Sequence, residues 1–364
     1  MDSVLDSRFR AAQSRAVQGF WRPRVPLADR LRALADYADG LPADAAAWDG
    51  YGEHGAVAAL ESRVAELLGT DAAAYFPSGV MAQQIALRIW CDRMGNRRVA
   101  LPDLSHLIVH EEDGPRLLHD LEYVHLTTGA VTASAADVER APGELGAVLV
   151  ELPLRDGGYL LPSWDDLTAL AEACRERGTP LHFDGARLWE STPWFGRSLP
   201  EVSALADSVY VSFYKGLGGL SGAALAGDDE FVREAKLWRR RMGGTVWTSA
   251  PHAISALQGL DEVLPRMGEL HDFAQRLAGE LASAGVRVIP QEPQTNAFRV
   301  FLEADRDTVR ERVVTALETD GFALPFGWQS ANVPGWSFCE VTVSPQILDE
   351  DPTVLAQRLA ALEG

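Results

Sequence analysis

The feature that most constrains the fold is an alternation of short apolar runs with stretches of helical spacing between about residues 57 and 250. The apolar runs include RVALP, LGAVLVELP, TPLHFDGA, DSVYVSF and GAALAG. Strands that alternate with helices pair mainly in parallel, because the helix brings the chain back to the edge where the previous strand began. The pattern therefore predicts an α/β fold with a mainly parallel sheet covered on both faces.

Two of the helical stretches contain their own boundary signals. In the first, apolar residues recur at helical spacing from Val57 to Leu68, and Gly69 follows where a helix commonly ends. In the second, SWDDLTALAEACRERG opens on Ser163 with Asp166 three residues later and closes on Gly178. Both stretches are predicted to be helices.

The character of the chain changes along its length, which predicts three parts. Residues 1–47 form an arginine-rich arm interrupted by prolines that has room for one helix and packs on the other domains or on a partner subunit. Residues 48–250 form the large domain. Residues 251–364 form a smaller α/β domain, in which a long helical stretch precedes the strands VRVIP, AFRVFLE and FCEVTVS. We expect the boundary between the domains near Pro251.

Charge and composition exclude several classes of partner. The net charge of −19 argues against nucleic acid and anionic membranes, because like charges repel. The amino terminus, MDSVLDSRFR, lacks the apolar core of a secretory signal, and no window approaches the length of a membrane span. The three cysteines are far apart and have no metal-ligand spacing. We expect a cytoplasmic protein whose partner is a small molecule or a second copy of itself.

Ligands of parallel sheets bind beyond the carboxyl ends of the strands, so the turns there are the places to search for chemistry. The most informative one follows VYVSFY and contains Lys215, although the chain has only two lysines among its 33 Lys and Arg residues. Desolvation at the end of a buried strand lowers the pKa of a lysine and gives the free amine that forms Schiff bases. Glycines at 216, 218 and 219 let the backbone approach a planar ligand closely.

Two other turns each have a structural and a functional interpretation. Ser78 and Gly79 are either a helix cap and turn or a cradle in which free N–H groups hold a phosphate. Asp184 ends the apolar run TPLHFD and is either half of an ion pair with Arg187 or the partner of a protonated cofactor ring nitrogen. Taken singly, Ser78 and Gly79 favour the cap and turn, whereas Asp184 fits both of its interpretations equally.

Two alternatives from other classes of site were weighed and not adopted. His106 and His110 would share one face of a helix, which suits a metal, but only two ligands are defined. The turn KGLGGLSG resembles a degraded dinucleotide-binding motif, but GAALAG after it reads as a strand where that motif needs a helix. We therefore expect no metal and no dinucleotide.

The combination of these turns fits one cofactor, pyridoxal 5'-phosphate. That cofactor needs an anion site, a ring-stacking group, an acid at its ring nitrogen and a lysine that captures its aldehyde. The turn at Ser78, the ring of His106, the acid Asp184 and the amine of Lys215 supply these in that order along the chain.

At this point the sequence resembles the threonine aldolase and β-eliminating lyase family of fold type I pyridoxal-phosphate enzymes. The resemblance covers roughly residues 48–265 and rests on the order and spacing of the stretches WDGYGEHGAVAALESRVAELLG, YFPSGVMAQQIAL, SHLIVHEEDG, LHFDGARLWES and KGLGGLSGAALAGDDEFVREAKLWRRRMGG. It implies the fold of that group: a large, mainly parallel sheet domain of the seven-stranded type and a smaller C-terminal α/β domain.

The resemblance also implies roles for individual residues. It makes Lys215 the Schiff-base lysine, Asp184 the partner of the ring nitrogen and His106 the ring-stacking residue. For the phosphate and the rest of the cofactor, it adds Ser78, Gly79, Val80, Ser212 and Arg187. Substrate binding falls to Arg187, near the substrate carboxylate, and to Tyr51.

The chain also departs from the family pattern on the substrate side. The usual Glu-Asn-Thr-His-Asn reads Glu151-Leu-Pro-Leu-Arg155, so Leu154 stands at the second histidine position, and Tyr214 replaces the serine before the lysine. The amino-terminal Ser-Asp-Thr segment of the aldolases is not found, and two family arginines are replaced near residues 243–248 and 338–340.

The resemblance implies a carbon–carbon lyase of amino-acid metabolism that cleaves a β-hydroxy-α-amino acid to glycine and an aldehyde, with His106 or a bound water as the base. The departures keep open another pyridoxal-phosphate reaction on an amino acid, namely β-elimination, racemisation, transamination or condensation, and also a non-catalytic protein of the same fold. A homodimer or homotetramer with shared active sites is implied as well.

Overall fold

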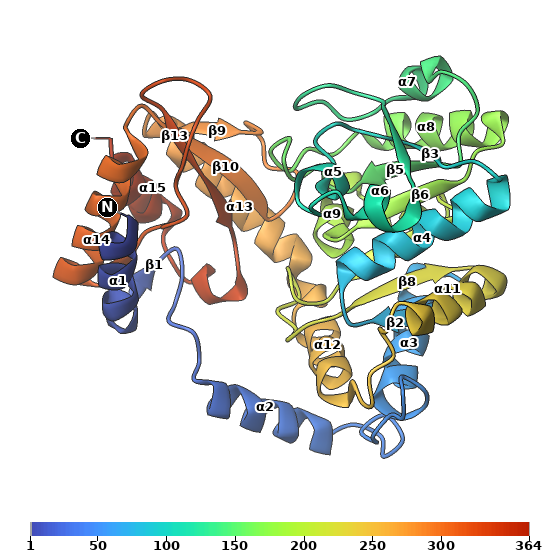
Figure 1. Cartoon of the computed structure of the whole chain (residues 1–364). Helices are drawn as coiled ribbons and strands as arrows, with labels where there is room; N and C mark the ends of the chain where they lie inside the picture. The colour runs from blue at the N-terminus through green and yellow to red at the C-terminus, as the bar shows by residue number, and fades with distance from the viewer. Residues whose placement is uncertain (1, 364) are drawn as a thin grey trace. The chain divides into compact units, whose positions relative to one another are not determined.

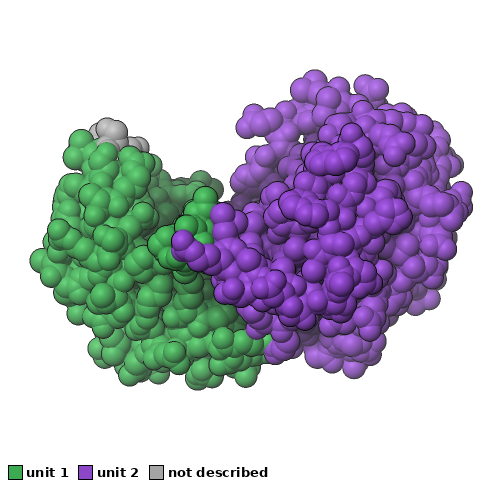
Figure 2. Space-filling view, turned by 90° about the horizontal axis from the view of Figure 1, so that it is seen from below, with its two compact units in different colours: residues 1–29, 266–364 green, residues 30–265 purple. Residues whose placement is uncertain are grey.

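The computed structural model describes residues 2–363 and divides the chain into two compact units (Figure 2). Unit 2 comprises residues 30–265, and unit 1 comprises residues 1–29 together with residues 266–364. The divisions predicted from the sequence lie at residues 47 and 250. Unit 2 extends beyond Pro251 because α12 (Ala250–Glu262) packs against α3 (Gly55–Leu68) of the same unit.

Unit 2 is built on a seven-stranded sheet with the strand order β2-β8-β7-β6-β5-β3-β4. β8 is antiparallel to both of its neighbours, and all the other pairs are parallel. The mainly parallel sheet expected from the sequence is therefore confirmed. The strands are β2 (Ala72–Phe76), β3 (Arg98–Leu101), β4 (Glu122–His125), β5 (Ala147–Glu151), β6 (Leu181–Gly185), β7 (Ser208–Ser212) and β8 (Ala223–Gly227).

Both faces of the central strands are covered. Every residue of β5, β6, β7 and β8 is buried, which requires packing on each side of the sheet. On one face α4 (Gly79–Met94) lies across the strands and contacts most of them (Figure 1). Its Trp90 stacks on Phe231 of α11 (Asp229–Arg241) with the ring centroids 5.2 Å apart, which joins the two helices over the sheet.

Two helices of unit 2 begin and end where their boundary signals predicted. α3 ends at Leu68, and Gly69 caps it in the left-handed conformation with φ 66°. α8 (Trp164–Arg177) is capped by Ser163, whose Oγ accepts a hydrogen bond from the backbone N–H of Asp166. The other helices of this part of the chain are α2 (Leu27–Asp39), α5 (His106–Val109), α6 (Gly114–His119), α7 (Ala135–Arg140), α9 (Leu188–Phe195) and α10 (Leu199–Ser203).

Unit 1 has an antiparallel sheet with the order β12-β13-β10-β9 and a short parallel pair, β1 with β11. The larger sheet contains the three strands expected after residue 251, and β12 is an addition. The elements are α1 (Asp2–Ala12), β1 (Gln18–Gly19), α13 (Met267–Ser283), β9 (Arg287–Ile289), β10 (Ala297–Leu302), α14 (Arg306–Asp320), β11 (Phe322–Ala323), β12 (Gln329–Ser330), β13 (Ser337–Thr342) and α15 (Pro352–Ala360).

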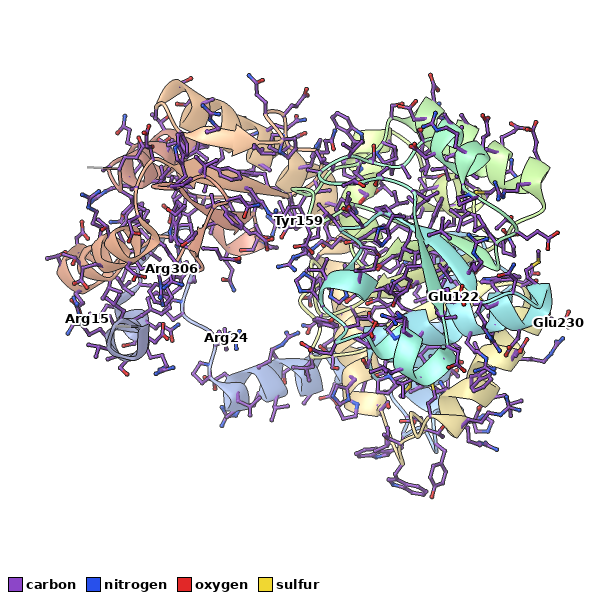
Figure 3. All side chains as sticks on the ribbon, turned by 45° about the horizontal axis from the view of Figure 1, so that its top comes forward. Arg15, Arg24, Glu122, Tyr159, Glu230 and Arg306 are labelled. Carbon is purple, nitrogen blue, oxygen red and sulfur yellow. The ribbon has the colours of Figure 1, made fainter. Side chains whose placement is uncertain are left out.

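The first helix of the arm is held by α14. Arg8 of α1 pairs with Glu318 at 2.7 Å, and Arg15, marked in Figure 3, donates to the backbone oxygen of Glu318 at 3.0 Å. The sequence predicts room for one helix in the arm, whereas residues 2–47 form both α1 and α2. Across residues 2–363, no helix has both the length and the apolar character that crossing a bilayer requires.

Gly146 directly precedes β5 and is so closely packed that it has no room for a side chain, which gives a prediction about stability. A Cβ on Gly146 would lie 2.1 Å from the backbone oxygen of Asn96 and 2.7 Å from Sγ of Cys91. We expect Gly146→Ala to lower the free energy of unfolding by about 1–3 kcal/mol, because the neighbouring backbone must move. Urea denaturation measures the effect. Gly50→Ala is the control, since nothing lies within 4 Å of the Cβ it would add, and equal stability of the two variants would contradict the prediction.

Candidate active site

A pocket in unit 2 lies where β3, β5, β6 and β7 end, at the carboxyl edge of the parallel strands. This is the edge at which sheets of this kind bind ligands. The pocket brings together most of the residues that the sequence analysis singled out, although they are far apart in the chain. These are Gly79, Val80, His106, Asp184, Arg187 and Lys215.

Lys215 stands three residues beyond the end of β7, in a turn that places its side chain in the pocket. Burial lowers the pKa of the Lys215 ammonium from its ordinary value of 10.5, and the charge of Asp184 opposes that shift. Close packing of the turn is possible because position 216 is a glycine, since a Cβ there would lie 2.2 Å from Oε1 of Glu190. The geometry therefore favours a lysine whose neutral, nucleophilic form is accessible.

Asp184 lies in β6 and is 2% exposed. Its Oδ1 accepts a hydrogen bond from the backbone N–H of Ala186 at 3.0 Å. Burial raises the pKa of the Asp184 carboxyl, and the charge of Lys215 opposes the rise. Arg187 pairs with Glu190 at 3.4 Å, and no ion pair joins Arg187 to Asp184. The carboxylate is therefore placed to hold a cation inside the pocket.

His106 begins the short helix α5 and is held at two points. Its backbone N–H donates to Oε2 of Glu151 at 3.0 Å, and its Nδ1 lies 3.4 Å from Oε1 of Glu111. The hydrogen bond to Glu111 raises the pKa of the His106 imidazole, against the effect of burial. Glu111 is fixed in turn by Gln84, whose Nε2 donates to Oε2 of Glu111 at 2.9 Å.

The histidines do not form a metal centre with their acidic neighbours. α5 is only four residues long, so His110 lies beyond its end and its Nε2 pairs with Asp156 at 2.7 Å. Within residues 2–363, no group of three or more His, Cys, Asp or Glu side chains is arranged to hold a metal ion.

The anion-binding turn is built at the start of α4. Ser78 is the residue that precedes the helix, but its side chain makes no capping hydrogen bond. Gly79 must be a glycine, because a Cβ there would lie 2.0 Å from Oη of Tyr210. The backbone N–H groups of the first helical turn have no partners within the helix, so an anion at this end is favoured.

The pocket fits pyridoxal phosphate on three counts. The start of α4 suits a phosphate, Asp184 suits a protonated ring nitrogen, and Lys215 supplies the amine. Ser212 is fully buried, and its side chain interacts with that of the pocket residue Tyr210. Ser78 and Ser212 themselves are not part of the pocket lining.

Tyr51, predicted to bind substrate, lies outside this pocket. Its ring is 54% exposed and contacts the ring of Trp247 edge-on at 5.0 Å. Its backbone N–H donates to the oxygen of Trp247 at 2.9 Å. Arg187 does line the pocket, and its guanidinium lies 5.4 Å from the ring centroid of Tyr159, which Figure 3 marks.

Several pocket residues were not singled out from the sequence. Gln83 lies one helical turn after Gly79, so helical spacing alone could have identified it. Glu151 and Tyr210 reach the pocket through the pairing of the strands, which the sequence does not specify. Burial, followed by the charge of Asp184, raises the pKa of Glu151 to about 8.

Comparisons with known proteins agree with this geometry. The family model described as "Beta-eliminating lyase" matches residues 43–305. The low-specificity L-threonine aldolase 1 of Arabidopsis thaliana is 29% identical over 73% of this chain and 77% of its own length. A crystal structure of a putative L-allo-threonine aldolase from Listeria monocytogenes is 36% identical, covers 99% of both chains and has a TM-score of 0.89.

A more distant structure shares the fold only. The serine palmitoyltransferase of Sphingomonas wittichii has a TM-score of 0.63 at 19% identity, covering 91% of this chain and 82% of that one. The family match extends over most of the chain and includes every pocket residue described above. The chain therefore belongs to the β-eliminating lyase family of fold type I pyridoxal-phosphate enzymes, as its sequence predicted.

Proposed function

We propose that this pyridoxal-phosphate lyase cleaves a β-hydroxy-α-amino acid of the threonine type into glycine and an aldehyde. The observation that supports this most directly is the pocket in which Lys215 and Asp184 influence each other's ionisation. Relatives that share the fold and a quarter or more of the sequence are named as threonine aldolases. The substrate class is therefore an amino acid with a hydroxyl group on its β-carbon.

The residues of this chain divide the work of holding the cofactor. When bound, pyridoxal phosphate supplies an aldehyde that captures amines and a ring that accepts the electrons of the breaking bond. The start of α4 at Gly79 and Val80 would hold the phosphate, and the carboxylate of Asp184 would favour a proton on the ring nitrogen. Lys215 would supply the amine that binds the cofactor aldehyde.

Two further residues act on the substrate. Arg187 lines the pocket with a guanidinium that pairs with Glu190, and its Nε is buried without a partner among the described residues. This free donor suits the substrate carboxylate. The base that accepts the proton of the β-hydroxyl group is His106, whose Nδ1 lies 3.4 Å from Glu111, or a bound water.

One observation favours a second candidate, another pyridoxal-phosphate reaction on an amino acid. Leu154, at the second histidine position of the family, is 1% exposed and is bound through its backbone to Leu160. Arg155 lines the pocket beside it. A guanidinium cannot accept a proton, so this wall of the pocket offers a positive charge where the family offers a base.

The reaction products distinguish the two candidates. With threonine, allo-threonine or phenylserine, the aldol reaction releases glycine and an aldehyde. A β-elimination would instead release ammonia and a 2-oxo acid. We expect glycine as the main product from at least one of the three, and its absence from all of them would favour the second candidate.

Replacement of Lys215 tests the proposed chemistry. We expect Lys215→Ala to lower kcat by about 1000-fold or more, because the amine that captures the cofactor is lost. Glycine release from the best substrate measures the effect. Lys236→Ala is the matched control, since the other lysine pairs with Glu61 at 2.6 Å and does not line the pocket. Turnover that survives the loss of Lys215 would refute the assignment.

The coupling between Lys215 and Asp184 gives a prediction that needs no substrate. With two lysines in the chain, NMR of ¹³C-methylated, cofactor-free protein follows each amine separately. We expect Lys215 to titrate below 10.5, because burial lowers its pKa. In Asp184→Asn its pKa should fall further, since the charge that opposes the shift is removed. Lys236 is the internal reference, and an unchanged Lys215 pKa in the variant would contradict the coupling.

We also propose that the enzyme is a homo-oligomer in which Tyr51 serves the pocket of a neighbouring subunit. Tyr51 lies outside the pocket of its own chain, and the Trp247 ring beside it is 68% exposed. Exposed aromatic pairs of this kind are typical of protein interfaces.

The free, buried cysteines Cys91, Cys174 and Cys339 support action in a reducing compartment such as the cytoplasm.

Mixed oligomers test the shared site. We expect Lys215→Ala and Tyr51→Ala each to be weakly active alone. When the two variants are unfolded together and refolded, or co-expressed, some subunit pairs should hold one intact site, and activity should reappear. Separately treated variants that are combined only in the assay are the control. If mixed oligomers form and no activity returns, Tyr51 does not act across subunits.

A further inference from the structure

Behind the pocket, a chain of buried polar groups runs between α4 and the sheet. Nε1 of Trp90 donates to Oγ of Ser208 at 2.8 Å, and Oγ of Ser208 lies 2.8 Å from Nδ1 of His182. Nε2 of His182 lies 2.6 Å from Oε1 of Gln83. Gln83, at the end of this chain of hydrogen bonds, lines the pocket. The core is therefore connected to the ligand site through one continuous set of hydrogen bonds.

With Oε1 of Gln83 facing His182, the direction of each side-chain bond in this chain follows. The imidazole of His182 is fully buried, and burial lowers its pKa to about 3, so it is neutral and has one N–H. An amide oxygen only accepts, so Nε2 of His182 donates to Gln83 and Nδ1 must accept. The hydroxyl of Ser208 then donates to Nδ1, and its oxygen accepts from Trp90, which can only donate.

The opposite orientation of the Gln83 amide is less favourable. If its NH₂ group faced His182, Nε2 of the imidazole would accept and Nδ1 would donate to Ser208. The oxygen of Ser208 would then accept from both Trp90 and His182, and its own hydroxyl hydrogen would have no acceptor in this chain. A buried donor without an acceptor costs roughly 1–3 kcal/mol. With a ligand oxygen in the pocket to accept from Gln83, the arrangement that points its NH₂ group away from His182 satisfies all four groups.

That NH₂ group has no partner within the described residues. Gln83 is 2% exposed, and its Nε2 is buried without a hydrogen bond. Gly79 and Val80, where the anion-binding turn begins, line the same pocket. A fixed and unsatisfied donor beside a site for an anion is a group that awaits an acceptor.

We propose that Gln83 is a cofactor-binding residue, whose side-chain NH₂ group donates a hydrogen bond to an anionic oxygen of pyridoxal phosphate. The inference rests on the assignment of this cofactor to the pocket. Two oxygens have the required chemistry, a phosphate oxygen and the ring hydroxyl oxygen. His182, Ser208 and Trp90 act through Gln83, because they fix which end of its amide faces the ligand.

Binding measurements without any amino acid test the proposal. Cofactor-free wild type and Gln83→Leu are titrated with pyridoxal phosphate, pyridoxal and inorganic phosphate. We expect the variant to bind pyridoxal phosphate about 10- to 100-fold more weakly, the loss typical of a hydrogen bond to a charged group. A parallel loss for inorganic phosphate identifies the phosphate oxygen, and a parallel loss for pyridoxal identifies the ring oxygen. Wild type that binds no pyridoxal phosphate would instead overturn the cofactor assignment.

Gln258→Leu is the matched control, because Gln258 is also a buried glutamine of unit 2 but both ends of its amide have protein partners. Its affinity for all three ligands should equal that of wild type. If Gln83→Leu also binds all three within about twofold of wild type, the proposal is wrong.

A second measurement needs no variant. In ¹⁵N-histidine-labelled wild type, His182 should be neutral at pH 7 with its proton on Nε2. In uniformly ¹⁵N-labelled wild type, the side-chain NH₂ signal of Gln83 should shift when pyridoxal phosphate is added. A proton on Nδ1, or a Gln83 signal that the cofactor leaves unchanged, would overturn the assignment even if the leucine variant failed to fold.

Discussion

The burial of one amine and one carboxylic acid in the same pocket is the constraint on which the site depends. Water stabilises the charged forms of Lys215 and Asp184, and burial removes that stabilisation from both. The charge of each group only partly offsets the effect of burial on the other, so the pKa of Lys215 stays lowered and that of Asp184 stays raised. A cofactor that brings a cation to the acid and an aldehyde to the amine relieves both penalties. The protein therefore pre-organises the site through the burial of groups that the cofactor satisfies.

The fold supplies that burial through the order of its strands. β6 and β7 are central neighbours, so their carboxyl ends deliver Asp184 and the turn with Lys215 to one place. The antiparallel strand β8 pairs with the other edge of β7. α4 packs on one face of the sheet, and its first turn reaches the pocket from that face. Glycines at 79 and 216 permit the close approaches that this packing requires. The chemistry and the packing thus depend on the same elements.

Much of this arrangement could be predicted from local signals. The capping serine of α8 and the left-handed glycine after α3 lie where short-range hydrogen bonding requires them. Lys215 stood out because the chain uses arginine almost everywhere else. The predictions that failed concern features that depend on tertiary contacts. α1 packs on α14, a contact that the sequence does not specify, and the long helical stretch after residue 250 divides at Pro265 into α12 and α13.

The same distinction separates the predicted pocket residues from those that were missed. His106, Asp184 and Lys215 could be predicted because each lies in a turn that follows a strand. The hydrogen-bonded chain from Trp90 to Gln83 could not, because only the packing of α4 on the sheet brings its residues together.

The central claim is that Lys215 alone captures the cofactor. Borohydride reduction of the cofactor-loaded protein, followed by mass spectrometry of its peptides, shows which of the two lysines of the chain holds the cofactor. The account predicts a pyridoxyl group on Lys215 and none on Lys236, and a label on Lys236, or no label at all, would contradict it.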